Sequence, residues 1–247
     1  MNPPIEFNTE RLRVRQWRFS DRKPFAELNA DPRVMEFFPS TLSPEASHAA
    51  VDRWQSQIAE RGWGLWAVEI RRTSEFIGFV GLQIPQAPLP FAPCVEIGWR
   101  LAHARWGQGY ATEAAKAALR VGFEQLRLEE IVSLTAVINR RSRAVMERLG
   151  MREDNTTFLH PNVPEGSPLR EHCLYRLSRE EWMRDPSSMS VILRMPMVLI
   201  PYHSFKIQAK NSLPSSLGRL LPPAASTTLM AAPRSTRSHQ PKSNDIS

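Results

Sequence analysis

The chain has 247 residues, of which 42% are hydrophobic, and its 32 Lys and Arg outnumber its 25 Asp and Glu to give a net charge of +7. This hydrophobic share is typical of a globular protein and excludes disorder throughout, while two Cys are too few for a disulfide scaffold. The first ten residues lack the apolar run of a signal peptide, and the longest apolar stretch, 191–202, is interrupted and too short to cross a membrane. We therefore expect a cytoplasmic protein with no membrane partner.

The positive charge is concentrated near the end of the chain. From Pro186 onward seven basic residues accompany one acid, so this segment holds +6 of the +7 and leaves +1 for residues 1–185. It is rich in Ser and Pro and has little apolar surface to bury, which predicts one folded domain at 1–185 followed by a disordered basic tail at 186–247. The basic residues of the tail are scattered and lack interleaved aromatic residues, so nucleic acid is not an expected partner.

Periodicity and turn residues predict the elements in chain order. Ser43 before Pro44 combines a capping hydroxyl with a Pro at the first helical position, and Gly62 ends the same helix. The full series is a strand at 12–16, helices at 20–28 and 44–62, strands at 64–70, 76–84 and 95–101, a helix at 108–126, a strand at 131–137, a helix at 141–149, and strands at 151–158 and 171–177. A Pro-rich loop occupies 85–93, after a predicted hairpin. This order predicts an α+β fold with a largely antiparallel sheet.

One turn in this series is suited to binding phosphate. The sequence Arg-Trp-Gly-Gln-Gly-Tyr-Ala-Thr-Glu at 105–113 joins a strand to a helix through Gly107 and Gly109, whose backbone can approach a ligand closely. The first amides of a helix lack intrahelical partners, and the helix dipole is positive there. A P-loop is excluded because no Gly-Lys-Ser/Thr is present, and a dinucleotide turn because Thr112 replaces the third Gly and no acid ends the next strand. The turn alone leaves a plain strand–turn–helix connection open.

A second sequence motif indicates which kind of strand–turn–helix connection this is. The segment from Asn139 through Ser142 to Leu149-Gly150-Met151 follows the next strand, and together with the turn it resembles the GNAT superfamily of acetyl-CoA-dependent N-acetyltransferases. The resemblance is closest to the branch that includes the ribosomal-protein N-terminal acetyltransferases, and it extends from Glu10 to about Trp182. Much of the superfamily has Gln or Arg where this chain has Trp106, which implies that backbone amides do most of the anion binding.

The resemblance implies a GNAT-like α+β fold: a mixed, mostly antiparallel sheet with flanking helices, in which the parallel strands 95–101 and 131–137 splay apart around the pantetheine arm of CoA. The cofactor-binding residues that it implies are Gly107, Gln108, Gly109, Tyr110, Ala111 and Thr112 for the pyrophosphate, Asn139 for the pantetheine, and the amides near Gly98 and Trp99 for the thioester carbonyl and its oxyanion. Asn139 also fits a helix cap.

The implied reaction transfers an acetyl group from acetyl-CoA, the cosubstrate, to a primary amine on a protein N-terminus or a small molecule. The amine attacks the thioester directly, through a tetrahedral intermediate. Because amines are protonated at neutral pH, a base is needed, and Glu96 is the candidate. Ser142 is the candidate acid for the departing thiolate. Glu96 also fits a surface carboxylate and Ser142 a capping residue, as in a non-catalytic acyl-CoA-binding module, which is the alternative function.

No metal is expected. His160 and His172 flank a Pro-rich loop but have no acidic or Cys partner in register, and Cys94 and Cys173 fit small strand hydrophobes. The expected partners are therefore acetyl-CoA and an amine acceptor, and the expected assembly is a monomer or a homodimer.

Overall fold

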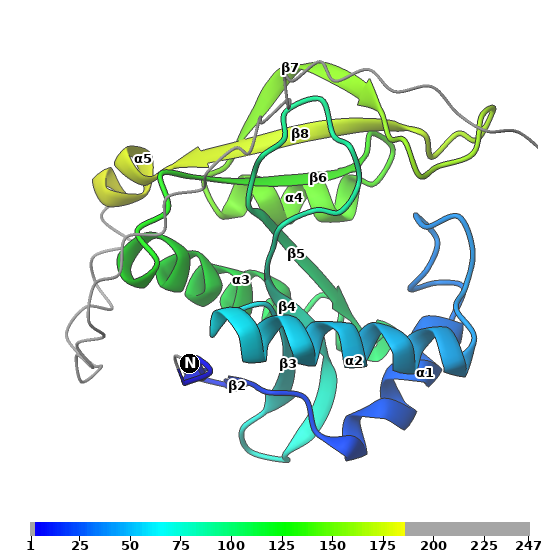
Figure 1. The fold of residues 1–247 in the computed structure, drawn as a ribbon, viewed down its shortest axis with the longest axis vertical. Helices are drawn as coiled ribbons and strands as arrows, with labels where there is room; N and C mark the ends of the chain where they lie inside the picture. The colour runs from blue at the N-terminus through cyan, green and yellow to red at the C-terminus, as the bar shows by residue number, and fades with distance from the viewer. Residues whose placement is uncertain (1–2, 186–247) are drawn as a thin grey trace, which may run out of the picture. The chain divides into compact units, whose positions relative to one another are not determined.

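A computed structural model of the chain describes residues 3–185 (Figure 1). The tail expected at 186–247 lies outside the described residues, so its predicted disorder stays a prediction. Within the described part, no helix is both long and apolar enough to cross a membrane.

Eight strands of residues 3–185 form one sheet in the order β1-β2-β3-β4-β5-β6-β8-β7. Every neighbouring pair is antiparallel except β5 and β6, which are parallel. The elements are β1 (Phe7–Asn8), β2 (Leu12–Arg15), α1 (Arg22–Ala30), α2 (Pro44–Arg61), β3 (Leu65–Ile70), β4 (Glu75–Gln83), β5 (Glu96–Leu101), α3 (Tyr110–Arg120), β6 (Glu130–Ala136), α4 (Arg140–Arg148), β7 (Arg152–Leu159), β8 (Glu171–Ser178) and α5 (Arg179–Arg184). The mixed, mostly antiparallel α+β fold expected from the sequence is confirmed.

Helix boundaries follow the local signals with one exception. Ser43 Oγ accepts a hydrogen bond from the Ala46 amide at the start of α2, and Gly62 ends that helix with a φ of +85°. The helix expected at 108–126 instead begins at Tyr110 and changes after Arg120 into a π-helical turn, Val121–Gln125. A π-turn hydrogen-bonds one residue further along the chain than an α-helix does, and the apolar periodicity does not distinguish the two.

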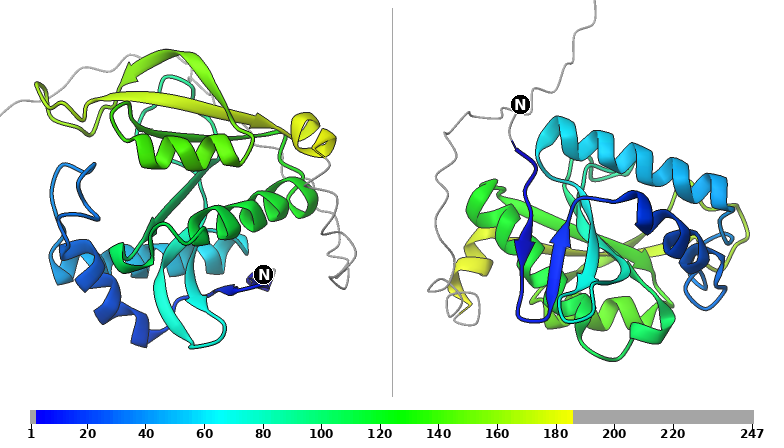
Figure 2. Two further views of the ribbon diagram at one scale, coloured as in Figure 1. Left: turned by 180° about the vertical axis from the view of Figure 1, so that it is seen from behind. Right: turned by 90° about the horizontal axis from the view of Figure 1, so that it is seen from below.

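The helices cover the two faces of the sheet separately (Figures 1 and 2). On one face, Phe79 of β4 packs against Trp54 of α2 at a ring separation of 4.8 Å and against Phe25 of α1 at 6.0 Å. On the other face, α3 and α4 lie side by side, and Leu82 of β4 lies beside Gly122 at the end of α3. We call these the α1/α2 face and the α3/α4 face. Because side chains alternate along a strand, each residue of β4 and β5 belongs to one of the two.

The parallel strands β5 and β6 separate partway along their length. They are in register only where Glu96 faces Val132, next to a hydrogen bond of 2.9 Å from the Val132 amide to the Val95 carbonyl. The Ser133 hydroxyl then donates to the Ile97 carbonyl at 3.0 Å. Beyond Ile97 no register pair joins the two strands in the described part of the chain. The splay implied by the family resemblance is therefore present.

A buried ion-pair network attaches β2 to its neighbours. Arg15, which is 2% exposed, donates from Nη1 to Asp21 and from Nε to Glu69, both at 2.7 Å. Both carboxylates are also about 2% exposed. Each buried charge is hydrogen-bonded by a partner of opposite sign, and Glu69 also accepts a hydrogen bond of 3.0 Å from the half-exposed Arg18, so removing Arg15 leaves Asp21 as the uncompensated charge.

Replacing Arg15 by Met should lower the free energy of unfolding by about 3–5 kcal/mol, because Asp21 would remain buried without a cation and Glu69 would keep only the half-exposed Arg13 and Arg18. Urea denaturation followed by circular dichroism measures this difference. The control is Arg184→Ala, which breaks an exposed ion pair with Glu180 and should leave the unfolding midpoint unchanged. Equal stability of Arg15→Met and the wild type would contradict the assignment.

Candidate active site

The turn before α3 has the geometry of an anion site. Gly107 and Gly109 have φ values of +72° and +80°, a left-handed conformation that other residues adopt with strain. The first backbone bond of the helix runs from the Glu113 amide to the Gly109 carbonyl. The amides of Tyr110, Ala111 and Thr112 consequently have no backbone acceptor, and they point out of the positive end of the helix. These amides are among the groups that the sequence analysis expects to bind phosphate, and their role stays a prediction.

Arg11 holds this turn in place from the N-terminal part of the chain. Its Nε donates to the Glu113 carboxylate at 2.6 Å, its Nη1 donates to the Gln108 carbonyl at 2.9 Å, and its guanidinium lies 4.6 Å from the ring centre of Tyr110. Thr9 Oγ1 donates to the same carboxylate at 2.5 Å. Glu113 lies in the first turn of α3, where its negative charge would repel a bound anion. Arg11 neutralises this charge.

The gap between β5 and β6 exposes a backbone donor. Val95 and Ile97 present their carbonyls to β6, and because backbone groups alternate along a strand, Trp99 presents its N–H and C=O to the same side, where the ladder has ended. The neighbouring Leu101 carbonyl accepts a hydrogen bond of 2.8 Å from Trp106 Nε1. The indole of Trp106 is thereby occupied, which leaves anion binding at the turn to backbone amides.

Glu96, Gly98 and Arg100 form a row on the α1/α2 face of β5. Arg100 donates from Nη1 to Asn29 Oδ1 of α1 at 2.7 Å, which fixes the face to which all three belong. A Cβ built on Gly98 would meet no atom within 4 Å, so the space in front of this glycine is open. The glycine turn at 107–109 leads into α3 on the opposite face. The gap after Ile97 therefore lies between the glycine turn on one face and the row on β5 on the other.

Glu96 is the titratable group beside this opening. Its carboxylate accepts a hydrogen bond of 2.9 Å from Gln83 Nε2 on β4. Burial raises the pKa of Glu96 to about 7, against the smaller opposing effect of the Gln83 hydrogen bond. A carboxylate with this pKa accepts a proton at neutral pH far more readily than an exposed one.

Asn139 and Ser142 form a hydrogen-bonded pair at the start of α4. Asn139 Oδ1 accepts from the Ser142 amide at 3.2 Å, and its Nδ2 donates to Ser142 Oγ at 3.1 Å and to Thr135 Oγ1 at 2.9 Å. Asn139 is therefore a helix cap, with both amide protons used and one acceptor position left. The Ser142 hydroxyl accepts from Asn139, which leaves its own proton available for donation. Arg141 lies 4.9 Å from the ring centre of Trp106, so this pair borders the phosphate turn.

The histidines and cysteines do not form a metal site in the described residues, where no group of three or more His, Cys, Asp or Glu is placed to hold an ion. His160 and His172 have ring centres 4.7 Å apart, and burial lowers the pKa of His172 to about 4. Burial also raises the pKa of the Cys94 thiol to about 11, which makes it a poor nucleophile.

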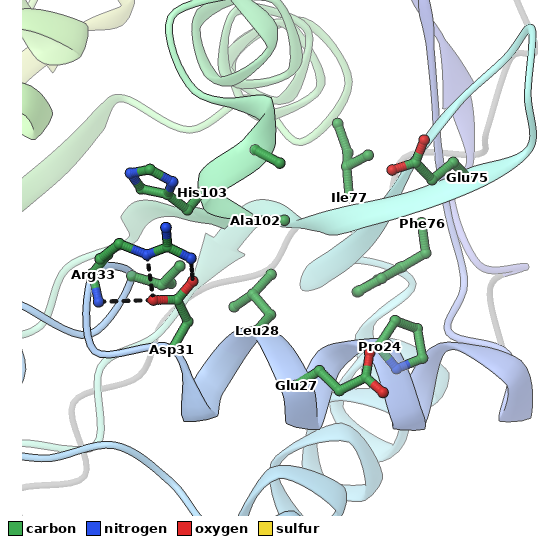
Figure 3. A pocket seen from close by; sticks show the side chains of 12 residues that line it. Pro24, Glu27, Leu28, Asp31, Arg33, Glu75, Phe76, Ile77, Ala102 and His103 are labelled. Carbon is green, nitrogen blue, oxygen red and sulfur yellow. Dashed lines mark hydrogen bonds and ion pairs between the residues drawn. The ribbon is translucent and has the colours of Figure 1, made fainter.

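A cavity of about 360 Å³ lies between α1 and the ends of β4 and β5 (Figure 3). Its charged side chains include Asp31, which is paired with Arg33 at 2.7 Å, and Glu75, which is bound by Arg105 outside the cavity. Neither Glu96 nor Gly98 lines it. The cavity is therefore separate from the row on β5.

The splayed strands, the glycine turn and the capped α4 define an acetyltransferase fold, and the chain belongs to the GNAT family of acetyltransferases. Residues 11–152 match the family described as "Acetyltransferase (GNAT) domain". The chain is an N-acetyltransferase, and the family uses acetyl-CoA as cosubstrate. The family predicted from the sequence is confirmed.

Individual relatives agree with this assignment. The chain is 32% identical over 187 residues to the "FsC-acetyl coenzyme A-N(2)-transacetylase" of Aspergillus fumigatus, covering 72% of this chain and 77% of that protein. It is 34% identical over 159 residues to the "Uncharacterized protein YkkB" of Bacillus subtilis, covering 63% and 90%. A solved GNAT acetyltransferase from Bacillus anthracis superposes with a TM-score of 0.60 at 25% identity, covering 72% of this chain and all of that one.

Three side chains at the site are not predicted by the sequence. Arg11 lies within the segment that resembles the family but is not predicted to be a site residue, and neither are Gln83 and Arg100. The contact of Arg11 with Glu113 spans 102 residues, and no local pattern indicates it. Gln83 and Arg100 follow from the register of β4 against β5, in which Gln83 faces Glu96, and from strand alternation, which places Arg100 four residues along the same face as Glu96.

The raised pKa of Glu96 predicts a pH-dependent stability. An acid whose pKa is higher in the folded state costs stability as the pH rises from its unfolded value of 4.5 toward about 7. Glu96→Gln removes this cost. The free energy of unfolding of Glu96→Gln relative to wild type should therefore be higher at about pH 7.5 than at about pH 5, as urea denaturation at both pH values measures. A difference that does not change with pH would show that Glu96 titrates normally.

Proposed function

We propose that the enzyme transfers the acetyl group of acetyl-CoA directly to a primary amine, on a protein N-terminus or a small molecule, and that Glu96 accepts the proton of the attacking amine. The observation that carries the proposal is the position of Glu96 on the α1/α2 face, two residues from the opening at Gly98, and we take this face as the acceptor side. Its pKa of about 7 allows it to be deprotonated in the resting enzyme and protonated during the reaction.

The other groups of the proposed site act on the thioester. The amides of the turn from Gly107 to Thr112 would hold the pyrophosphate, and Asn139 would accept a hydrogen bond from the pantetheine through its remaining acceptor position. The Trp99 N–H, aided by the side-chain-free backbone at Gly98, would stabilise the oxyanion of the tetrahedral intermediate. Attack by the nitrogen forms the C–N bond, and collapse of the intermediate breaks the C–S bond. Ser142 would donate its hydroxyl proton to the departing thiolate while taking one from water, and Glu96 would release the amine proton to water.

The name of the Aspergillus relative supports amine acetylation from acetyl coenzyme A. The acceptor itself is not carried over from that protein. The cytoplasmic location and the assembly as a monomer or homodimer stay predictions.

The base is tested with Glu96→Gln. Acetyl transfer to amines and N-terminal peptides is followed by release of free CoA thiol, with products identified by mass spectrometry. The variant should bind acetyl-CoA normally but lose about 10²- to 10⁴-fold in kcat, because no group takes the amine proton. The exposed Glu60→Gln on α2 serves as the control and should match the wild type. Unchanged turnover in Glu96→Gln would exclude Glu96 as the base. An absence of thiol release with every acceptor would favour the acyl-CoA-binding module.

The phosphate turn is tested with Gly109→Asp. A carboxylate at the start of α3 would repel the pyrophosphate, so acetyl-CoA binding measured by calorimetry should be lost. Gly166→Asp is the matched control, because Gly166 also has a left-handed φ, +76°, and a Cβ there would meet no atom within 4 Å. Both variants carry the same backbone strain and the same charge. Equal acetyl-CoA affinity of the two would mean that the phosphates bind elsewhere.

A further inference from the structure

Arg100 is a cation that the protein encloses without an anion. Its Nε is buried and has no hydrogen-bond partner in residues 3–185, and its Nη1 binds the neutral side chain of Asn29. Among the described residues, no carboxylate lies within ion-pair distance of it. Arg15, which is 2% exposed, is met by two carboxylates. Burial lowers the pKa of Arg100 to about 10, and at neutral pH the guanidinium still keeps its charge.

The surroundings of Arg100 favour a planar anionic partner. The guanidinium lies 4.1 Å from the ring centre of Phe38 and 5.5 Å from that of Phe79, so two aromatic rings flank it. Phe38 is 38% exposed although it is a large apolar residue, which places the Phe38 side of Arg100 at the protein surface. A guanidinium with unused N–H donors in a partly dry site binds carboxylates strongly, because its fork matches their two oxygens.

The position of Arg100 relates this anion site to the acceptor. On β5, Arg100 and Gly98 are two residues apart on the same face, which corresponds to about 7 Å along a strand. Glu96 lies the same distance on the other side of Gly98. A molecule whose amine reaches the opening at Gly98 therefore extends toward Glu96 on one side and toward Arg100 on the other.

We propose that Arg100 binds a carboxylate of the acceptor, so that the enzyme acetylates amines that carry a carboxylate a few bonds from the nitrogen. This inference rests on the proposed function and names the acceptor class of the same site. The carboxylate can belong to a free amino acid or to an acidic side chain at the start of a peptide. An acceptor with several positive charges would be repelled by Arg100, which lacks a compensating acid.

Acetylation kinetics on matched acceptors test the proposal with the full-length enzyme. The acceptors are an amino acid, its primary amide, the decarboxylated amine, spermidine, and dipeptides that begin with Asp or Asn. The kcat/KM for the amino acid or for the Asp dipeptide should be about 10- to 100-fold higher than that for its neutral counterpart. A preference for the amino acid identifies a free amino acid as the source of the carboxylate, and a preference for the Asp dipeptide identifies an acidic side chain. Equal rates on charged and neutral acceptors, or a preference for spermidine, would overturn the proposal while leaving acetyl transfer established.

Variants of Arg100 distinguish binding from a structural role. Arg100→Gln should raise KM for the carboxylated acceptor about 10- to 100-fold, with little change in kcat and little effect on the neutral amine, and Arg100→Lys should restore part of the affinity. Arg53→Gln, an exposed arginine on α2, is the control and should behave as the wild type. Equal losses on charged and neutral acceptors in Arg100→Gln would assign Arg100 to structure alone.

A binding measurement tests the carboxylate site independently of acetyl transfer. The hydroxy acid that corresponds to the best amino acid lacks the amine and cannot react, but it keeps the carboxylate. In the presence of CoA it should raise the melting temperature of the wild type and of Glu96→Gln, but not that of Arg100→Gln. Binding without any acetyl transfer would contradict the proposed function and retain the carboxylate site. The absence of a shift in the wild type would overturn the carboxylate site.

Discussion

The hydrogen bond from the Ser133 hydroxyl to the Ile97 carbonyl marks the point at which the sheet stops being continuous, and the site depends on that interruption. Up to Ile97 the parallel strands β5 and β6 are joined, and beyond it the backbone groups of Trp99 have no neighbouring strand to bind. Unpaired backbone groups are costly when they are shielded from water, so a sheet retains such a gap only where something else satisfies it. The Trp106 indole satisfies the Leu101 carbonyl, and the Trp99 amide is the group that we propose binds the thioester carbonyl.

Because side chains alternate along a strand, the residues of β4 and β5 are divided between the two faces of the sheet. Leu82 of β4 packs toward the end of α3, whereas Arg100 of β5 points to α1. The helix that offers free amides and the row that offers a carboxylate and an arginine consequently lie on opposite sides of one strand. In the proposed reaction, acetyl-CoA and the acceptor would therefore approach from opposite faces and meet at the gap.

Much of this arrangement could be predicted from the sequence, because it depends on local signals. Ser43 with Pro44 marks a helix start, and Gly107 with Gly109 marks a turn whose left-handed backbone other residues adopt only with strain. The remainder depends on contacts between distant segments. The partnership of Arg11 with Glu113 and the burial that raises the pKa of Glu96 appear only when the sheet is assembled. The sequence also does not predict the π-turn after Arg120, because its apolar positions fit an α-helix equally well.

The clamp between Arg11 and Glu113 has a consequence for how the protein matures. It closes a loop of about a hundred residues, and such closures carry an entropic cost that more local contacts must first reduce. During synthesis, the first β-strands leave the ribosome long before Glu113 exists to receive them. The start of α3 can therefore reach its final form only after the segment before β2 has packed against it.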